Sequence, residues 1–283
     1  MSFRGLLRRA FVNWVPFCPT YDRAYALGLY LLTHKRWPGH YLFNDRLVRL
    51  KMDGELLDPL RQALTDKVFV KQYAEALLGP QYVPKTYAVL ATKQEVYDYE
   101  FPKECVVKPC HTCGNILFVR DGSVDRKLVA LWLKIDFYKR SREQNYAFVK
   151  PKIIVEEFAF GPEYVPNDYK VFCVDGAPKA VLVFLDRFTG MTRVFYDLDW
   201  NPQPFGLGYP VGRLEPRPAN LDQMLEAAAK LSKGTSFIRI DLYTDRTTFK
   251  VGEITNCHAS ANERFSPRPG EHILSALLFG EQR

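Results

Sequence analysis

The stretch ECVVKPCHTCGN, residues 104–115, decides how this chain is interpreted, because it contains two competing motifs. Cys110 and Cys113 form a Cys-X-X-Cys motif, which is typical of redox sites and zinc sites. Lys108 stands at the end of an apolar run, before a compact loop that contains Gly114. Such a loop can fold its backbone amides around phosphates while the lysine neutralises their charge. One motif predicts metal or redox chemistry, and the other predicts a nucleotide site.

The surroundings of the two cysteines favour the lysine interpretation. A redox motif normally begins a helix, whose dipole lowers the thiol pKa, whereas this motif follows one strand-like run and leads into another. A structural zinc site needs four ligands, and the sequence has no second Cys-X-X-Cys and no His-X-X-X-His pair. Cys257 and His258 remain as candidates, but adjacent residues of an extended chain point to opposite faces. We therefore expect the cysteines to line the loop.

The composition is that of a globular protein with a basic surface. The chain has 283 residues, of which 47% are hydrophobic, and a formal net charge of +7. This charge favours acidic partners such as nucleotides, sugar acids or anionic lipid. The basic residues are scattered and no nucleic-acid-binding motif occurs, so we expect no nucleic-acid partner.

The sequence also bears on location. No apolar run approaches the roughly 18 residues that a membrane span needs. Six cysteines without an export signal predict reduced thiols in a cytoplasmic protein. For the basic, partly amphipathic residues 1–17 two alternatives stay open: a helix docked on the protein, or a peripheral helix on the inner face of the membrane.

The apolar periodicity predicts an α+β fold dominated by antiparallel sheet. Residues 1–65 are expected to be helical with a break near Pro38 and Gly39, and Thr65 is expected to cap a helix that ends at Gly79. The other expected elements are strands over residues 85–90, 104–109, 115–120 and 152–160, two strands over 169–185 that turn at Asp175-Gly176, a hairpin over 187–200, a helix that Asn220 caps and Gly234 follows, and strands over 237–245 and 249–255.

Two carboxylates stand in the last two of these strands. Asp241 and Glu253 are brought near one another by the short polar turn between the strands. Such a pair beside a lysine-bearing loop suits Mg²⁺ on a polyphosphate, because Mg²⁺ prefers hard oxygen ligands, usually one or two carboxylates. The alternative is a pair of solvated surface acids. Apolar neighbours such as Ile240 and Ile254 place both carboxylates within well-formed strands, which favours the metal site.

A purine slot is predicted where residues 152–160 end. Glu156 and Glu157 close a strongly apolar run, and a Gly-Pro-Glu segment follows that ends at Glu163. Nucleotide pockets are largely apolar with a few polar anchors. The backbone and one carboxylate would contact the adenine edge, and Glu163 would reach the ribose. The residues alone therefore predict a nucleotide-phosphate site.

Several long blocks carry a resemblance to a known family. They are DKVFVKQY (66–73), KPKIIVEEF (150–158), NDYKVFCVDGAPK (167–179), FYDLDWNPQPFGLGYP (195–210), AAKLSKGTSFIRIDLY (228–243) and GEIT (252–255). At these blocks the chain resembles the ATP-grasp superfamily, and more closely its branch related to the teichuronopeptide biosynthesis (TupA-like) proteins of cell-wall and capsule polysaccharide pathways. The similarity runs from about residue 41 to residue 269.

The resemblance implies a fold in which two α+β subdomains grip ATP between antiparallel sheets. A helical region, residues 1–65, would precede a small subdomain with the phosphate loop, residues 66–154. The large subdomain, residues 155–283, would carry the adenine slot and the metal carboxylates. The cofactors implied are ATP and Mg²⁺.

The resemblance also implies roles for individual residues. Residues that would bind ATP are Lys67, Lys108, His111, Thr112, Cys113, Gly114, Glu156, Glu157, Phe158, Ala159, Glu163 and Lys170. Asp241 and Glu253 would hold two magnesium ions, and Thr255 stands at the position of a further ligand. Arg239 would stabilise the oxyanion of a tetrahedral intermediate and, with Lys108, is the expected catalytic residue.

The sequence departs from the family pattern at two of these places. The phosphate loop is usually richer in glycine, often His-Gly-Ser-Gly, whereas here Thr112 and Cys113 precede Gly114. Many members have an asparagine two residues after the metal glutamate, where this chain has Thr255. Asn256 is the nearest substitute, but the alternation of a strand points it to the other face.

The function implied is that of an ATP-dependent carboxylate–amine ligase, which forms an amide through an acyl phosphate. The carboxylate would be a uronic acid of a surface polysaccharide or its precursor, and the amine an amino acid. Arg193, Tyr196 and Arg264 are expected to recognise the acceptor. The alternatives are a glycosyltransferase or kinase of the same pathway, or a catalytically silent nucleotide-binding partner.

Overall fold

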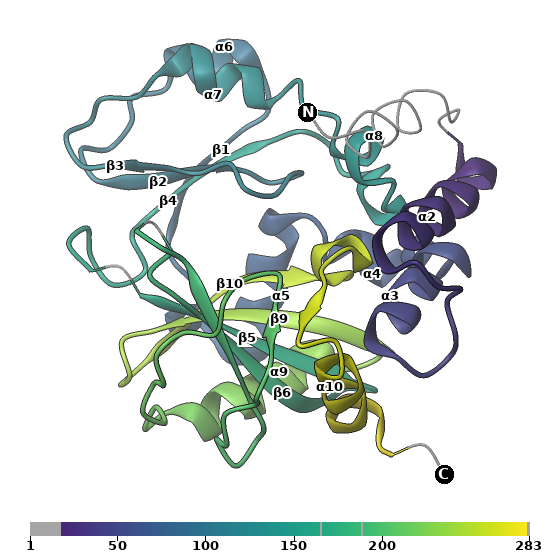
Figure 1. Ribbon diagram of the computed structural model, residues 1–283. Helices are drawn as coiled ribbons and strands as arrows, with labels where there is room; N and C mark the ends of the chain where they lie inside the picture. The colour runs from purple at the N-terminus through teal and green to yellow at the C-terminus, as the bar shows by residue number, and fades with distance from the viewer. Residues whose placement is uncertain (1–17, 165, 188, 282–283) are drawn as a thin grey trace.

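The computed structural model describes residues 18–164, 166–187 and 189–281 (Figure 1). The helix expected within residues 1–17 lies outside this part of the chain. The N-terminal region that is described is helical, as predicted, with α2 (Pro19–His34), α3 (Phe43–Met52), the 3₁₀ turn η1 (Glu55–Leu57) and α4 (Pro59–Ala63). The expected break near Pro38 and Gly39 lies between α2 and α3. Among the described residues, no helix is both long and apolar enough to cross a bilayer.

A four-stranded antiparallel sheet forms the upper layer in Figure 1. It comprises β1 (Thr86–Leu90), β4 (Ile153–Glu156), β2 (Cys105–Pro109) and β3 (Leu117–Val119), in this spatial order. The helices α6 (Lys93–Asp98) and α7 (Arg126–Trp132) cover one face. Because side chains alternate along a strand, Cys105 and Val107 enter the core beneath α7. Val106 and Lys108 therefore point to the other face, toward the second sheet.

A five-stranded antiparallel sheet forms the lower layer, in the spatial order β10-β9-β5-β6-β7. Its strands are β5 (Asn167–Val174), β6 (Ala177–Leu185), β7 (Thr192–Tyr196), β9 (Phe237–Thr244) and β10 (Phe249–Thr255). The helices α5 (Lys67–Leu78) and α9 (Leu221–Ser232) pack on one face, against Tyr169, Val171 and Ile240. The helices α2, α3 and α10 (Gly270–Phe279) pack on the other face, against Phe172 and Leu182.

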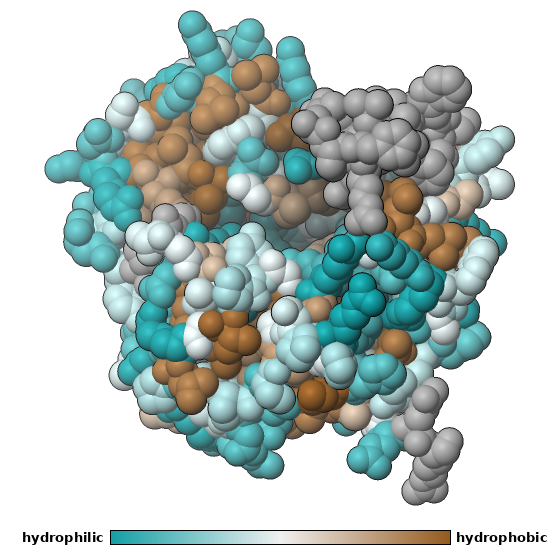
Figure 2. Space-filling model, viewed as in Figure 1, coloured by the Kyte–Doolittle hydropathy of each residue, from teal (hydrophilic) through white to brown (hydrophobic). Residues whose placement is uncertain are grey.

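Short elements complete the chain. They are η2 (Pro80–Tyr82), α8 (Phe137–Ser141), η3 (Gln144–Tyr146), η4 (His258–Ala261) and the two-stranded sheet of β8 (Gly206–Leu207) and β11 (Phe265–Ser266). Figure 2 shows the surface hollowed between the two layers. The predicted α+β class with mainly antiparallel sheet is confirmed.

Three local predictions are wrong in detail. Asp66, not Thr65, caps α5: its carboxylate accepts the amide hydrogen of Val68 at 3.0 Å, while the Thr65 hydroxyl donates to the carbonyl of Arg61. Asn220 stands at the start of α9, but its side chain donates to Thr244 instead of capping. The hairpin expected over residues 187–200 is wrong: the described part of this stretch contains one strand, β7 (Thr192–Tyr196), which pairs with β6.

Candidate functional site

An apolar slot of about 250 Å³ opens between the two sheets. Its apolar lining comes from β2 and β3, from the segment after β4 and from β9, and includes Val106, Ile116, Phe118, Phe158, Ala159 and Tyr243. The rings of Phe118 and Phe158 stack at 5.9 Å between centroids. Glu156, Glu157 and Lys108 also line the slot. An aromatic-walled cavity of this size with a few charged groups at its edge suits a planar heterocycle.

Glu156 lies buried at one end of the slot between two lysines. Its carboxylate is 2.5 Å from the Lys108 ammonium and 2.6 Å from that of Lys71. Burial alone would raise the pKa of Glu156, but Lys108 and Lys71 outweigh it and hold the pKa below its ordinary value. Burial lowers the pKa of Lys71 despite the neighbouring Glu156 carboxylate. Glu156 therefore holds Lys108 in place at the rim of the slot.

The predicted phosphate loop follows β2. The Lys67 ammonium donates to the carbonyl of Thr112 at 2.6 Å and so ties the loop to the start of α5. Gly114 has a φ of +86°, a conformation that glycine adopts without strain. The Thr112 hydroxyl is buried and has no hydrogen-bond partner among the described residues. A group bound at the loop would satisfy it.

The His111 ring is held by two backbone groups. The ring is buried, with Nε2 at 3.2 Å from the carbonyl of Trp132, and its Nδ1 accepts the amide hydrogen of Lys152 at 3.3 Å. Burial lowers the pKa of this imidazole. Both ring nitrogens are therefore occupied by backbone groups, which anchors the loop on β4 and α7.

The two cysteines of the loop lie in different surroundings. Cys110 is buried and Cys113 is exposed, so their thiols face different surroundings. Burial raises the pKa of Cys110 to about 12. Within the described ranges, no group of three or more His, Cys, Asp and Glu side chains is placed to hold a metal ion. Cys113 lines the neighbouring cavity beside Gly114.

The two predicted metal carboxylates lie directly opposite each other on β9 and β10. Glu253 is the register partner of Asp241 because a bulge interrupts the pairing after Val251. Without the bulge, Glu253 would oppose Ile240, whose side chain faces the core. The extra residue is Gly252, and a Cβ there would lie 2.6 Å from the Tyr243 ring. A glycine within a strand is a sequence signal for such a bulge.

Both carboxylates are surrounded by cations. Arg239 donates to both oxygens of Asp241, from Nε at 2.6 Å and from Nη2 at 2.7 Å, and Lys170 pairs with the same carboxylate. Asp241 and Lys170 are register partners on β9 and β5. The Asp241 oxygens thus already have cationic partners, so a metal ion would compete for them with Lys170.

Glu253 is the more accessible of the two. Its carboxylate lies 3.6 Å from Arg239 and 3.8 Å from Lys67, and it accepts a hydrogen bond from the Thr255 hydroxyl at 3.0 Å. Burial alone would raise the pKa of Glu253, but Lys67, Lys170 and Arg239 lower it to about 2. Glu253 is therefore ionised at neutral pH. Thr255 also accepts from Arg239 at 2.9 Å, so its hydroxyl orients the glutamate.

A second cavity of about 230 Å³ adjoins the slot and contains this cluster. Asp168, Arg187 and Tyr243 line both cavities. One oxygen of Asp168 contacts Lys170 at 2.8 Å and Arg187 at 3.2 Å. The other oxygen is buried and has no partner among the described residues. We call the second cavity the charged cavity from here on. The free oxygen of Asp168 lies between the apolar slot and the charged cavity, and it provides a polar group there.

A chain of buried polar groups extends from Arg239 along the wall of the charged cavity. His258 Nδ1 accepts a hydrogen from Arg239 at 2.6 Å, and Nε2 donates to Glu263 at 3.0 Å. Arg193 donates to the same carboxylate at 2.8 Å. Burial lowers the pKa of His258 to about 4, so the ring is neutral at pH 7. Burial would raise the pKa of Glu263, but His258 and Arg193 bring it to about 2.

The remaining predicted residues lie in different parts of the structure. Glu163 is exposed and is not part of the lining of the slot. Arg193 lines the charged cavity, stacked 4.0 Å over the ring of Phe184. Arg264 is exposed and borders a different pocket, described below.

The prediction that Tyr196 contacts an acceptor is wrong. Its side chain is 1% exposed and lies in the core beneath the five-stranded sheet. Its ring stacks on Trp200 at 4.1 Å, and its hydroxyl accepts the amide hydrogen of Glu215 at 2.8 Å. The side chain is thus held in the interior, where no substrate reaches it.

Sequence reasoning missed several residues of these cavities. They are Lys71, Asp168, Arg187, Tyr243, Glu263 and also His258, for which the sequence suggested only a role as a zinc ligand. Two of them had a local signal. Lys71 follows Lys67 by one helical turn, and Asp168 shares a strand face with Lys170. The others meet the site through tertiary contacts that no spacing predicts.

Comparisons with known proteins place the chain in a family. A family model described as TupA-like ATP-grasp matches residues 47–279. No curated protein sequence matches the chain.

Solved structures with a similar fold include an L-amino acid ligase from Bacillus licheniformis, which is 14% identical with a TM-score of 0.44 over 91% of this chain and 62% of that one. D-alanine–D-alanine ligase from Bacillus anthracis is 15% identical, with a TM-score of 0.38 over 68% and 56%. The ATP-grasp ligase PsnB, solved with a minimal precursor, Mg and ADP, is 16% identical, with a TM-score of 0.41 over 80% and 63%. The chain thus spans about three-fifths of the length of these proteins.

Proposed function

The chain belongs to the TupA-like ATP-grasp family, and from this premise we propose that it is an ATP-dependent ligase that joins a carboxylate to an amine. The observation that supports this most is the adjacency of the two cavities. An apolar, aromatic-walled slot opens into a cavity that contains Glu253, Asp241 and Arg239. A nucleoside triphosphate has the same order of parts along its length, with a flat base at one end and the negatively charged phosphates at the other.

ATP occupies the two cavities in this proposal. The adenine lies in the slot against the aromatic wall that Phe118 and Phe158 form together, and the free oxygen of Asp168 accepts a hydrogen bond from a ribose hydroxyl. Asp168 lines the slot, whereas Glu163 is exposed and does not. In this proposal Asp168 therefore binds the ribose, the role that was expected of Glu163. Lys67 and Lys108 neutralise phosphate charge at the loop.

The residues present also fit Mg²⁺. Glu253 is ionised and its side chain is 31% exposed toward the charged cavity, while Asp241 stands opposite as the second carboxylate. When bound, Mg²⁺ neutralises the charge of the phosphates and polarises the transferred phosphoryl group. Asp241 and Glu253 would hold the ion, and Lys170, which pairs with Asp241 here, would then neutralise phosphate charge instead.

The reaction has two steps. In the first, a carboxylate oxygen of the acceptor attacks the γ-phosphorus, the bond to ADP breaks, and an acyl phosphate forms. In the second, the amine nitrogen attacks the acyl carbon, phosphate leaves, and the nitrogen loses a proton. Arg239 is buried, permanently charged and lines the charged cavity, so in this proposal it stabilises the oxyanion of the second step. Losing one such donor typically costs about 10²–10³ in kcat.

The proposed substrates are a sugar carboxylate, such as a uronic acid of a surface polysaccharide or its precursor, and an amino acid. The net charge of +7 supports an anionic acceptor. A kinase or glycosyltransferase of the same pathway, or a silent nucleotide-binding partner, are the alternatives that the test separates.

The test begins with calorimetric titration of Mg·ADP into the wild type, Lys108→Ala and Lys103→Ala. Lys103 is an exposed lysine near β2 and serves as the matched control. We expect at least a tenfold loss of affinity for Lys108→Ala alone. Absence of binding to the wild type would contradict the nucleotide site.

Activity is then measured as phosphate release with uronic acids and amino acids. A ligase releases phosphate and ADP only when both substrates are present. A stable phosphorylated sugar without the amine would identify a kinase, preference for a sugar nucleotide a glycosyltransferase, and nucleotide binding without turnover a silent partner.

A further inference from the structure

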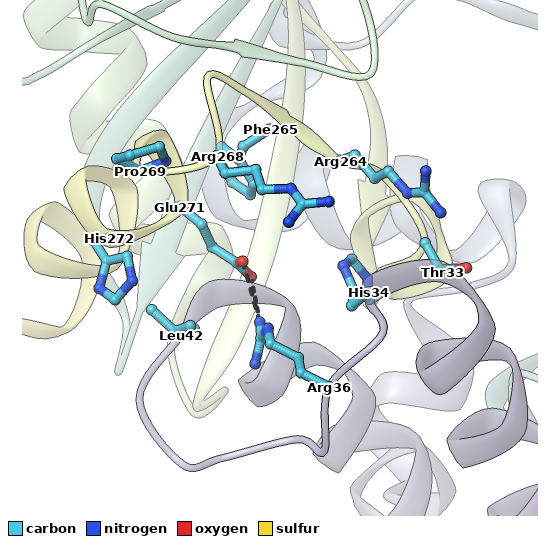
Figure 3. Close-up of a pocket in the computed structure, with 10 residues that line it drawn as sticks. All are labelled: Thr33, His34, Arg36, Leu42, Arg264, Phe265, Arg268, Pro269, Glu271 and His272. Atoms are coloured by element: carbon cyan, nitrogen blue, oxygen red, sulfur yellow. Dashed lines mark hydrogen bonds and ion pairs between the residues drawn. The ribbon is translucent and has the colours of Figure 1, made fainter.

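A separate cavity of about 320 Å³ lies between the end of α2, the loop before α3 and the start of α10 (Figure 3). We call it the arginine pocket, because Arg36, Arg264 and Arg268 line it together with a single acidic residue, Glu271. It does not share any lining residue with the apolar slot or the charged cavity.

The one carboxylate of the arginine pocket is already neutralised. Glu271 accepts hydrogen bonds from Arg36 Nη2 at 3.1 Å and from the Asn44 side chain at 2.9 Å. Arg36 is also paired with Asp45. These contacts hold Arg36 and Glu271 in the pocket wall and leave no acidic group for the other two arginines.

Arg264 and Arg268 therefore carry uncompensated charge. Both are exposed, and neither guanidinium has a hydrogen bond or an ion pair to any residue within the described ranges. Figure 3 shows the Arg268 side chain extending across the pocket, above His34. A guanidinium presents a planar fork of donors that matches the two oxygens of a carboxylate or phosphate. Two of them at one cavity favour an anionic ligand.

Apolar groups complete the lining. Leu42 and Phe265 line the same cavity, and Phe265 belongs to β11, which pairs with β8. A pocket with apolar walls and a few convergent charged groups is the usual form of a small-molecule site. The combination suits a ring with carbon–hydrogen faces that carries an anionic group, as an acidic sugar does.

The arginine pocket is connected to the charged cavity through one segment of chain. Glu263 lines the charged cavity and its neighbour Arg264 lines the arginine pocket. Consecutive Cα atoms are about 3.8 Å apart, and neighbouring residues of an extended segment point to opposite sides. The segment is held in place because the amide of Gly208 donates to the carbonyl of Arg264 at 3.1 Å. It thus forms a thin wall between the two cavities.

We propose that the arginine pocket binds a second anionic group of the acceptor, a carboxylate or phosphate distant from the reacting carboxylate, through Arg264 and Arg268. This inference rests on the proposed ligase function for the identity of the acceptor. It makes the acceptor a molecule with at least two negative charges, such as an oligomer of acidic sugars, instead of a single uronic acid.

The test is a titration of tetragalacturonate, with inorganic pyrophosphate as the second probe, into protein saturated with Mg·ADP. Saturation with the nucleotide keeps the probes out of the phosphate-binding loop. The variant is Arg264→Gln/Arg268→Gln. The matched control is Arg23→Gln/Lys127→Gln, which removes two positive charges from exposed positions on α2 and α7. Arg23 lies 11 residues before His34, which is roughly 16 Å along the helix.

We expect the variant to lose at least about tenfold in affinity while the control keeps the wild-type value, since two charge-assisted contacts are removed. Loss with tetragalacturonate identifies a carboxylate as the bound group, and loss with pyrophosphate alone identifies a phosphate. Unchanged affinity of the variant for both probes, or an equal loss in the control, overturns the proposal. Mg·ADP binding is measured first on each protein, so a failed nucleotide site is recognised separately from a failed arginine pocket.

Discussion

Replacing Glu156 by glutamine is expected to destabilise the protein by leaving two lysines without a counter-charge. The Glu156 side chain is 5% exposed, and those of Lys71 and Lys108 are 10% and 12% exposed. Removing one member of a buried ion pair typically costs about 3–5 kcal/mol, because the remaining charge is desolvated and unpaired. The glutamine oxygen keeps one hydrogen bond, and such bonds contribute about 1 kcal/mol. We therefore expect a loss near the lower end, about 3 kcal/mol.

The loss of stability is measured by urea unfolding at pH 7, monitored by circular dichroism. An equal slope of the unfolding free energy against urea concentration would show that both proteins unfold alike. The pH dependence of the loss has a defined sign. The lysines hold the pKa of Glu156 below its ordinary value of 4.5, so its ionised form stabilises the fold fully above that value. This contribution disappears as the pH falls through the lower pKa of the folded protein. The difference between wild type and Glu156→Gln should therefore narrow below pH 4.5.

The control is Glu157→Gln, at the next position. The Glu157 side chain is 34% exposed and lies 3.9 Å from Lys250, a geometry that contributes at most about 1 kcal/mol. The reasoning is refuted if Glu156→Gln costs no more than this control, or if the difference between wild type and Glu156→Gln widens as the pH falls.

Further predictions concern the nucleotide site. Glu253→Gln should reduce the affinity for Mg·ADP to that of ADP in the presence of EDTA, whereas equal Mg²⁺ dependence in both proteins would contradict the metal role. Gly252→Ala should weaken Mg·ADP binding and cost about 1–3 kcal/mol of stability, because its Cβ would lie 2.6 Å from the Tyr243 ring; unchanged calorimetry and unfolding would show that the bulge is not needed. The exposed Cys113 thiol lines the charged cavity beside Gly114, so Mg·ADP should slow its alkylation by iodoacetamide, and an equal rate with and without Mg·ADP, measured by mass spectrometry, would contradict this. Ile116→Ala removes part of the slot wall and should lower nucleotide affinity by about fivefold, with an unaltered affinity arguing against adenine in the slot.

The sequence by itself determined the elements that carry the site. The apolar runs around Asp241 and Glu253 predict two strands, and the short turn between them predicts that they pair. Lys108 at the end of an apolar strand and Lys67 at the start of a helix follow from equally local patterns. Such features are predictable because apolar periodicity and side-chain alternation depend on residues close in the chain, although the residue that caps the helix of Lys67 was placed one position too early.

The tertiary structure alone decided which charges meet. The bulge at Gly252 moves the Glu253 side chain from the core face of the sheet to the face that carries Asp241. The glycine within the strand was the sequence signal for this bulge. The partner of Lys71 is Glu156, which lies 85 residues away. Tyr196 is a residue type that is common in binding sites. It lies in the core because the register of β7 directs its side chain toward Trp200. Ion pairs and burial depend on how the two sheets pack across a cavity. This packing cannot be predicted from the secondary-structure propensities of residues that are close in the sequence.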